Sequence, residues 1–482
     1  MPTEPCLTSA VELAREIRDG ERSPVEVVEA HLDRIAERDE AVNAFVTVAD
    51  ERALAAAEEA ERALEDGEKL GPLHGVPVAV KDLDDVEGMR TTFGSRLFEE
   101  NVAEGSEPFV DRLLDAGAIV IGKTNTPEFG LGCTTDNLVA GETHTPFDTS
   151  RNSGGSSGGA GAALAAGMAP IAQGSDTGGS IRTPASFCGV YGIKPSFGRV
   201  PRVSRPDAFE AHAPFSHVGP MARTVEDAAL MLDLMAGPHP EDPFSLPETG
   251  DDYLAATDHG IEGLDVAYSP DLGTYPVEPE VGEVVADAVD AFEDAGATVE
   301  EAEIDLGCEQ SEVLEAFYTF ARVRWQSLFD ALERQGFDPR GADREKLRPV
   351  VVETILEGPE SEVTTREYKR ADRTRTRVYD GLQETLDEYD LLVSPTLSVL
   401  PFAHGEEPTE VDGVEIEPLR GWVLTQPYNM SGHPAASIPA GFVDGLPVGM
   451  QVAGRRYADE TVIAASAAFE RERPWHDAYE RL

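Results

Sequence analysis

The chain has 482 residues, of which 41% are hydrophobic, and its 91 acidic and 39 basic side chains give a formal net charge of −52. Such a surface repels phosphate groups, which argues against nucleic acid as a partner. The polar, acidic N-terminus is unlike a signal peptide, and no apolar run approaches the roughly 18 residues of a membrane span. We therefore expect a cytoplasmic protein with no membrane segment.

The acidic residues are spread along most of the chain, which favours a hydrated surface adapted to a salt-rich cytoplasm, where ions screen the repulsion between carboxylates. Residues 151–200 are the exception, since they hold one acidic and four basic side chains. We expect this segment to lie in the interior. The scattered cysteines predict neither a disulfide framework nor a zinc site and fit a reducing compartment; they are Cys6, Cys133, Cys188 and Cys308.

Helices and buried strands alternate along the first part of the chain. Helical periodicity covers residues 10–17, and Ser23-Pro24 predicts the N-cap and first residue of a helix that reaches about residue 37. Further helices are expected at 50–66, 108–116, 160–169 and 224–236, and strands at 76–80 and 118–122. This alternation predicts an α/β fold.

The character of the sequence changes between residues 240 and 380, where charged helices are expected, including 309–335 and 366–388. We interpret this segment as a helical elaboration on the substrate side of a single domain spanning residues 1–482, with a catalytic core at 70–235. Strands at 391–396, 436–442 and 447–454 and a helix from about 459 follow. The first and last thirds of the chain are expected to share one sheet.

Two glycine-serine segments flank the helix of small residues: residues 154–159 read GGSSGG and residues 174–184 read GSDTGGSIRTP. The first lacks the G-K-[ST] of a phosphate-binding loop. It matches the G-x-S-x-G nucleophile elbow, with His433 or His476 as the base, but that motif needs a buried strand directly before it, whereas the polar DTSRNS precedes it here. Neither interpretation is favoured.

Only six of the 39 basic residues are lysines, and Lys81 lies at the end of a predicted buried strand. Burial disfavours the charged ammonium, and a neutral lysine can act as a general base that activates a serine. The spacing alone leaves a simpler interpretation open, in which Lys81 is exposed or pairs with Asp82 or Asp84.

Ser180 follows Asp176-Thr177-Gly178-Gly179. Glycines permit a turn in which successive backbone N–H groups converge on one point, as an oxyanion hole requires. A tight strand-to-helix turn without chemistry is the alternative.

Residues 154–185 read GGSSGGAGAALAAGMAPIAQGSDTGGSIRTPA, and this long pattern resembles the signature of the amidase signature family. Residues 73–82 (LHGVPVAVKD), 122–130 (GKTNTPEFG), 187–200 (FCGVYGIKPSFGRV) and 438–454 (IPAGFVDGLPVGMQVAG) resemble other blocks of that family. The resemblance covers roughly residues 8–235 and 385–475. It implies a large mixed β-sheet core covered by helices on both faces, and neither a metal nor a cofactor.

The resemblance also implies a Ser-cisSer-Lys triad, with Ser180 as nucleophile, Ser156 as proton relay with its peptide bond cis, and Lys81 as the neutral base. The implied oxyanion hole consists of the backbone N–H groups of Thr177, Gly178, Gly179 and Ser180. Asp176 and Arg182 are expected to orient this loop as a structural ion pair.

The expected function is that of an amidohydrolase, which cleaves a small carboxylic amide to the acid and ammonia or an amine through a serine acyl-enzyme. Two alternatives are the glutaminase component of a tRNA-dependent amidotransferase, which needs partner subunits, and a non-catalytic scaffold. Residues 199–218 depart from the pattern expected of that glutaminase component, and the presence of all three catalytic side chains argues against the scaffold. Whether the chain forms a homodimer stays open.

Aromatic residues are frequent in the predicted helix 309–335. They line an acyl pocket or belong to the core of the helix packing, and the sequence does not decide between these. The residues are Phe317, Tyr318, Phe320, Trp325 and Phe329, with Trp422 and Tyr428 as further candidates.

Overall fold

The computed structural model describes residues 5–209, 216–353 and 362–482. Eleven strands form one mixed sheet in the order β1-β3-β2-β6-β8-β7-β14-β15-β11-β9-β10. These strands are β1 (Phe45–Val48), β2 (Pro77–Lys81), β3 (Ile119–Thr124), β6 (Ile171–Asp176), β7 (Tyr191–Lys194), β8 (His217–Ala222), β9 (Asp265–Tyr268), β10 (Thr298–Glu301), β11 (Leu391–Pro395), β14 (Ala435–Val443) and β15 (Leu446–Gly454). Two small two-stranded sheets pair β4 (His144–Thr145) with β5 (Asp148–Asn152) and β12 (Glu410–Val411) with β13 (Val414–Glu415).

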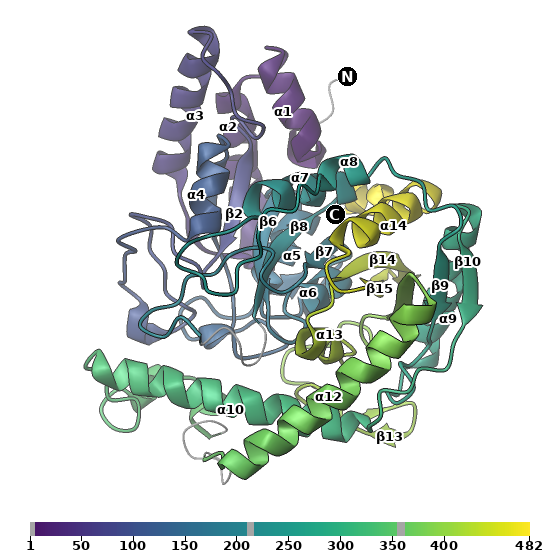
Figure 1. Cartoon of the computed structure of the whole chain (residues 1–482). Helices are drawn as coiled ribbons and strands as arrows, with labels where there is room; N and C mark the ends of the chain where they lie inside the picture. Colours follow the sequence, from purple (N-terminus) through teal and green to yellow (C-terminus); the bar gives the residue numbers. More distant parts are fainter. Residues whose placement is uncertain (1–4, 210–215, 354–361) are drawn as a thin grey trace.

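Helices surround this sheet (Figure 1). They are α1 (Ala10–Arg18), α2 (Pro24–Val42), α3 (Asp50–Glu65), α4 (Pro108–Asp115), α5 (Gly158–Ala165), α6 (Arg182–Phe187), α7 (Val225–Met235), α8 (Tyr253–Ala256), α9 (Pro279–Asp294), α10 (Gln310–Arg334), α11 (Pro349–Val351), α12 (Thr365–Glu388), α13 (Gln426–Ser431) and α14 (Asp459–Glu472).

The first and last thirds of the chain share the sheet, as predicted, because β7 pairs antiparallel with β14. Strands β2, β3, β6 and β8 are buried at every residue, so both of their faces are covered. The small-residue helix α5 packs against β2, β3 and β6, while α7, α9 and α14 pack together over other strands. The predicted α/β fold with a large mixed sheet is confirmed.

Local signals account well for the helix boundaries. The Ser23 hydroxyl accepts hydrogen bonds from the backbone N–H groups of Val25 and Glu26, and Pro24 occupies the first turn of α2, as predicted. The helix continues to Val42, beyond the expected residue 37, and ends where Asn43 adopts a left-handed conformation with φ of 55°.

The segment 240–380 is more than a helical elaboration. Its strands β9 and β10 extend the main sheet, with β9 parallel to β11, and α9 packs against β14. The sequence did not indicate these strands because each has only four residues, too few for a clear alternation pattern. The helical part consists chiefly of α10 and α12, which lie side by side at one edge of the molecule (Figure 1). Residues 354–361 of this segment lie outside the described residues.

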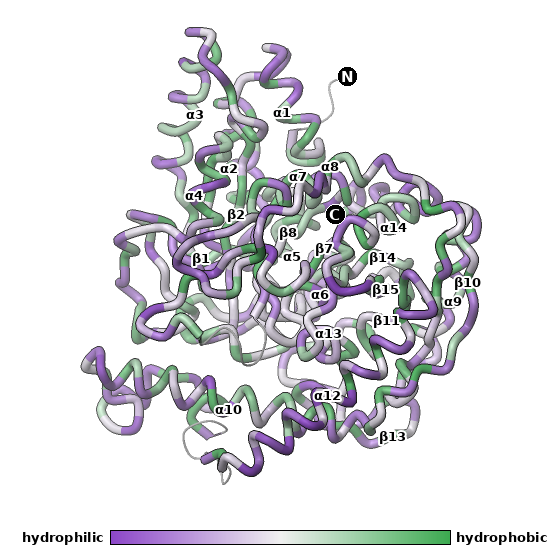
Figure 2. The backbone as a smooth tube through the Cα atoms, viewed as in Figure 1, coloured by the Kyte–Doolittle hydropathy of each residue, from purple (hydrophilic) through white to green (hydrophobic). Residues whose placement is uncertain are grey.

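Burial follows the distribution of charge. Residues 151–200 are almost entirely buried, which confirms the interior position expected of this segment. Hydrophilic stretches are prominent along the outer helices α10 and α12, whereas the central strands carry mostly neutral to hydrophobic residues (Figure 2). Among the described residues, no helix combines the length and apolar character needed to cross a membrane.

Candidate active site

The candidate residues meet at one edge of the sheet. Lys81 is the last residue of β2 and Asp176 is the last residue of β6. These strands are parallel neighbours, so their carboxyl ends lie together. The loop that follows β6 carries Ser180 into α6, and the loop before α5 carries Ser156. Because α5 packs against both β2 and β6, it holds the two loops beside Lys81.

The side chain of Lys81 is fully buried and surrounded by hydroxyl groups. Its Nζ lies 2.7 Å from Ser156 Oγ, 2.8 Å from Ser157 Oγ and 3.1 Å from Ser175 Oγ. No carboxylate lies within ion-pair distance of this amine in the described part of the chain. The simpler interpretation, an exposed or ion-paired Lys81, does not hold.

Burial lowers the pKa of Lys81 from 10.5 to about 7. The negative charges of Asp84 and Asp176 act in the opposite direction and Arg202 lowers the pKa further, but desolvation dominates. A large fraction of Lys81 is therefore an uncharged amine near neutral pH, with a lone pair available to accept a proton.

Ser156 and Ser180 line one cavity of about 240 Å³. The Gly155–Ser156 peptide bond is cis. Ser156 contacts the lysine amine directly, whereas no hydrogen bond joins the hydroxyls of Ser156 and Ser180 among the residues described. The geometry thus brings base and relay into contact and exposes the relay and the nucleophile to the same space. His433 and His476, the bases that a nucleophile elbow would need, do not line this cavity.

The glycine loop presents backbone N–H groups near Ser180, but Gly179 has a different role from the one expected. Its N–H donates to Asp176 Oδ1 at 2.8 Å. The N–H groups of Thr177, Gly178 and Ser180 donate to no backbone acceptor within the described residues. Gly179 has a φ of +117°, which a residue with a side chain rarely adopts, and it is this conformation that turns the loop. The candidate oxyanion donors are therefore these three N–H groups.

Asp176 and Arg182 form a fully buried ion pair with two hydrogen bonds of 3.0 Å. Burial raises the pKa of Asp176, but Arg182 and the amide of Asn429 outweigh it and hold this pKa below its usual range. The same carboxylate accepts the Gly179 and Ile181 N–H groups. The pair thus fixes the conformation of the loop that carries Ser180.

Two contacts of Lys81 were not anticipated from the sequence, those with Ser157 and Ser175. Both serines stand inside the two glycine-serine segments, but nothing in the one-dimensional pattern distinguishes them from Ser156. Lys123, also buried, instead contacts Thr91 Oγ1 and pairs with Asp82 at 3.5 Å.

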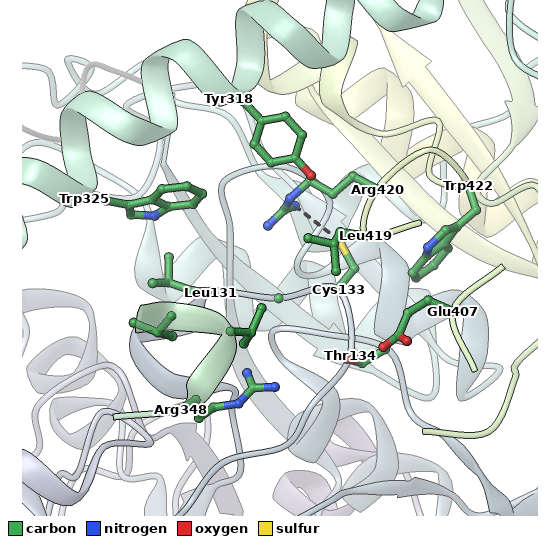
Figure 3. Close-up of a pocket in the computed structure, with 13 residues that line it drawn as sticks. Leu131, Cys133, Thr134, Tyr318, Trp325, Arg348, Glu407, Leu419, Arg420 and Trp422 are labelled. Carbon is green, nitrogen blue, oxygen red and sulfur yellow. Dashed lines mark hydrogen bonds between the residues drawn. The ribbon is translucent and has the colours of Figure 1, made fainter. Parts of the chain in front are cut away.

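The helix α10 closes one side of the catalytic cavity with Phe317, Trp325 and Leu328. A neighbouring cavity of about 270 Å³ shares Leu131, Trp325 and Arg420 with it (Figure 3). The aromatic residues of the helix therefore divide between the two roles that the sequence left open. Phe317, Tyr318, Trp325 and Trp422 line cavities, whereas Phe320, Phe329 and Tyr428 pack in hydrophobic clusters.

Comparison with known proteins places these features in a family. The family model described as amidase matches residues 26–463. The chain belongs to the amidase family. An acylamidase of Rhodococcus erythropolis is 40% identical over 97% of this chain and 96% of that protein. The crystal structure of a bacterial aryl acylamidase of the amidase signature family has 36% identity and a TM-score of 0.94 and covers 98% of both chains.

The amidase family also includes the rival considered from the sequence. The glutaminase-type A subunit of tRNA-dependent amidotransferases is represented by a glutamyl-tRNA(Gln) amidotransferase chain from Symbiobacterium thermophilum, which is 36% identical over 98% of both chains. The acylamidase match has the higher identity. The expected resemblance, the fold and the class of amide-hydrolysing enzymes are confirmed by these relatives, and the non-catalytic alternative has no support among them.

Proposed function

We propose that this amidase hydrolyses a carboxylic amide through an acyl-enzyme on Ser180, with Ser156 as proton relay and Lys81 as base. The observation that carries the proposal is the contact of 2.7 Å between the buried amine of Lys81 and Ser156 Oγ, at the wall of the cavity that also contains Ser180. A neutral amine with a pKa of about 7 is suited to accept and return a proton near neutral pH.

In acylation, the Ser180 oxygen forms a bond to the amide carbon. Its proton passes to Ser156 Oγ, and the Ser156 proton passes to Lys81 Nζ. The carbonyl oxygen becomes an oxyanion, which accepts hydrogen bonds from the candidate N–H donors of the 177–180 loop. When the C–N bond breaks, the proton returns along the same route to the leaving nitrogen, and ammonia or an amine departs.

In deacylation, water attacks the ester carbon of the acyl-enzyme. Its proton follows the same relay to Lys81, the bond between carbon and the Ser180 oxygen breaks, and that oxygen recovers a proton. The carboxylic acid leaves and the resting enzyme is restored. Each donor to the oxyanion can contribute about 3 kcal/mol to lowering the barrier.

We assign residues 70–235 to the catalytic core and α10 to the substrate side of the domain. This assignment is supported by the positions of Lys81, Ser156 and Ser180 and by the α10 residues that line the cavity. We further propose that the enzyme acts without partner subunits, which is supported by the higher identity to the acylamidase and by the departure of residues 199–218 from the amidotransferase pattern. Residues 210–215 of that stretch lie outside the described residues.

The test is ammonia release from a panel of small amides, including acetamide, benzamide and glutamine, by the purified chain in molar potassium chloride. We expect turnover of a simple amide by the chain alone, and a loss of kcat of about 10⁶-fold in Ser180→Ala, as for removal of other catalytic serines. Unchanged turnover in Ser180→Ala would contradict the mechanism. Activity restricted to glutamine and dependent on added partner proteins would favour the amidotransferase role.

A further inference from the structure

The catalytic cavity has an unexpected charge. In a protein with a net charge of −52, its lining contains Arg202, Arg324 and Arg420, and no acidic residue of the described chain lines it. The rest of the lining is mainly apolar and aromatic. A cavity lined by charges of one sign and low-dielectric walls concentrates ligands of the opposite sign, so this composition favours an anionic ligand over a neutral one.

Two of these arginines converge beside the nucleophile loop. Arg202 Nη1 donates to Ser216 Oγ at 3.0 Å, and Arg324 Nη1 lies 3.4 Å from the same oxygen and 3.4 Å from Thr177 Oγ1. The Ser216 and Thr177 hydroxyls are 2.7 Å apart. Thr177 is three residues from Ser180, so the guanidinium pair is fixed at the end of the cavity where the substrate carbonyl must lie.

The third arginine is held differently. Arg420 donates to Cys133 Sγ at 3.2 Å, and its guanidinium lies over the ring of Phe317 at 5.1 Å (Figure 3). It separates the catalytic cavity from its neighbour. Arg202 and Arg324 are therefore the two arginines of the lining that contact the nucleophile loop and its neighbour Ser216.

We propose that the preferred substrates of this enzyme are amides that carry a second, anionic group, and that Arg202 and Arg324 bind this group. The inference rests on the proposed amide hydrolysis at Ser180. Two like charges repel when they approach one hydroxyl, and an anion between them reduces that repulsion. A carboxylate suits the planar donor fork of arginine and can be bound by paired hydrogen bonds. The aromatic wall then accommodates the apolar part of the substrate.

The experiment compares amides that differ in charge and little in shape. 4-Carbamoylbenzoate is paired with 4-nitrobenzamide, and succinamate is paired with butanamide. Ammonia release gives kcat and KM for each at pH 9, above the pKa of Lys81, so that the effect of Arg202 on that pKa does not enter. The potassium chloride concentration is the same throughout, because salt weakens long-range attraction more than a hydrogen-bonded contact.

For the wild type we expect at least one anionic amide to exceed its neutral partner by tenfold or more in kcat/KM. Arg202→Gln and Arg324→Gln should each reduce that ratio at least tenfold, through KM, with the neutral amides changed less than threefold. Taking the ratio across variants cancels the different intrinsic reactivity of the two amides. Arg322→Gln is the matched control, since Arg322 lies on the same helix but faces a cavity between α10 and α12, and it should leave the ratio unchanged.

Equal or faster turnover of the neutral amides by the wild type would overturn this inference and leave the proposed function intact, and this result needs no variant to fold. Equal losses on both members of a pair in the glutamine variants would also overturn it, since they would indicate a role in holding the loop. A wild-type chain that hydrolyses none of the four amides contradicts the proposed function itself.

Discussion

At the scale of single residues, two buried lysines with different surroundings explain how one can be reactive and the other structural. Lys81 is surrounded by hydroxyls, whereas Lys123 forms an ion pair with Asp82, both with fully buried side chains. The hydroxyls solvate the amine of Lys81 without stabilising its charge as a carboxylate would. Its pKa therefore falls to about 7, and proton transfer near neutral pH becomes feasible.

The two lysines should respond in opposite ways to the same substitution. Lys81→Met is expected to lower kcat by about 10²–10⁴-fold, the contribution of a general base, without lowering the melting temperature. The unfolded chain binds the lysine proton between pH 7 and 10.5 while the folded one does not, so Lys81 costs stability most strongly below pH 7 and progressively less towards pH 10.5. Methionine removes that cost at neutral pH.

Lys123→Met serves as the control, because it leaves the buried carboxylate of Asp82 without its partner. It should destabilise the fold by about 3–5 kcal/mol. Thermal unfolding and kcat, measured for both variants, separate the two roles. A large drop in the melting temperature of Lys81→Met, or full activity in that variant, would contradict the assignment of Lys81 as base.

The pH dependence of kcat/KM reports the charge on Lys81. Because the protonated amine cannot accept a proton, activity should fall about tenfold per pH unit below pH 7 and level off above it. Asp84 raises the pKa of Lys81 through its negative charge. Asp84→Asn should therefore move the midpoint to lower pH, while the asparagine oxygen can still accept the hydrogen bond of Gln173 Nε2. A profile that is flat from pH 5 to 10, or a midpoint that moves upward, would exclude this role.

At the scale of elements, the helix α5 brings the two glycine-serine loops together, and glycine allows the close approach. A Cβ on Gly159 would collide with the backbone nitrogen of Asn125 and the backbone oxygen of Ala44. Every residue of α5 is buried, so the helix cannot move away without disturbing β2 and β6, which carry Lys81 and Asp176.

Gly159→Ala is therefore expected to destabilise the protein by about 1–3 kcal/mol or more, the range for overpacking a core, and to lower kcat by displacing the Ser156 loop. Gly282 in α9 provides the matched control, because a Cβ there meets no atom within 4 Å. Gly282→Ala should stabilise the protein by about 0.5–1 kcal/mol through helix propensity. Denaturant unfolding of both variants checks this, and equal stabilities would show that the close packing of α5 is not required.

At the scale of the whole molecule, the acidic surface predicts a dependence on salt. We propose that the chain is halophilic, because a charge of −52 destabilises the compact state by self-repulsion unless ions screen it. The buried and weakly charged segment 151–200 supports adaptation of the surface and not of the interior.

The melting temperature should rise by about ten degrees or more between 0.1 and 2 M potassium chloride, because screening at molar salt acts over about 3 Å. Sucrose at matched osmolarity is the control, since it stabilises proteins by exclusion from the surface without screening charge. Full stability and activity in dilute buffer, or an equal effect of sucrose, would remove the proposal.

The sequence alone determined features that depend on neighbouring residues. The strand that ends at Lys81, the capped start of α2 at Ser23, the helices α10 and α12 and the long glycine-serine pattern of residues 154–185 were all predicted from local signals. These signals suffice because turn geometry, capping and periodicity act over a few residues.

Only the tertiary structure decided the features that join distant parts of the chain. The hydroxyls around Lys81 lie 75 to 94 positions away from it, β9 and β10 find their place through pairing with β11, and Asp176 takes up the N–H of Gly179. The arginines of the cavity come from a loop after β7, from α10 and from the segment before α13. Such contacts arise from the packing of the sheet and its helices, and no local pattern in the sequence encodes which serine or arginine will face the cavity.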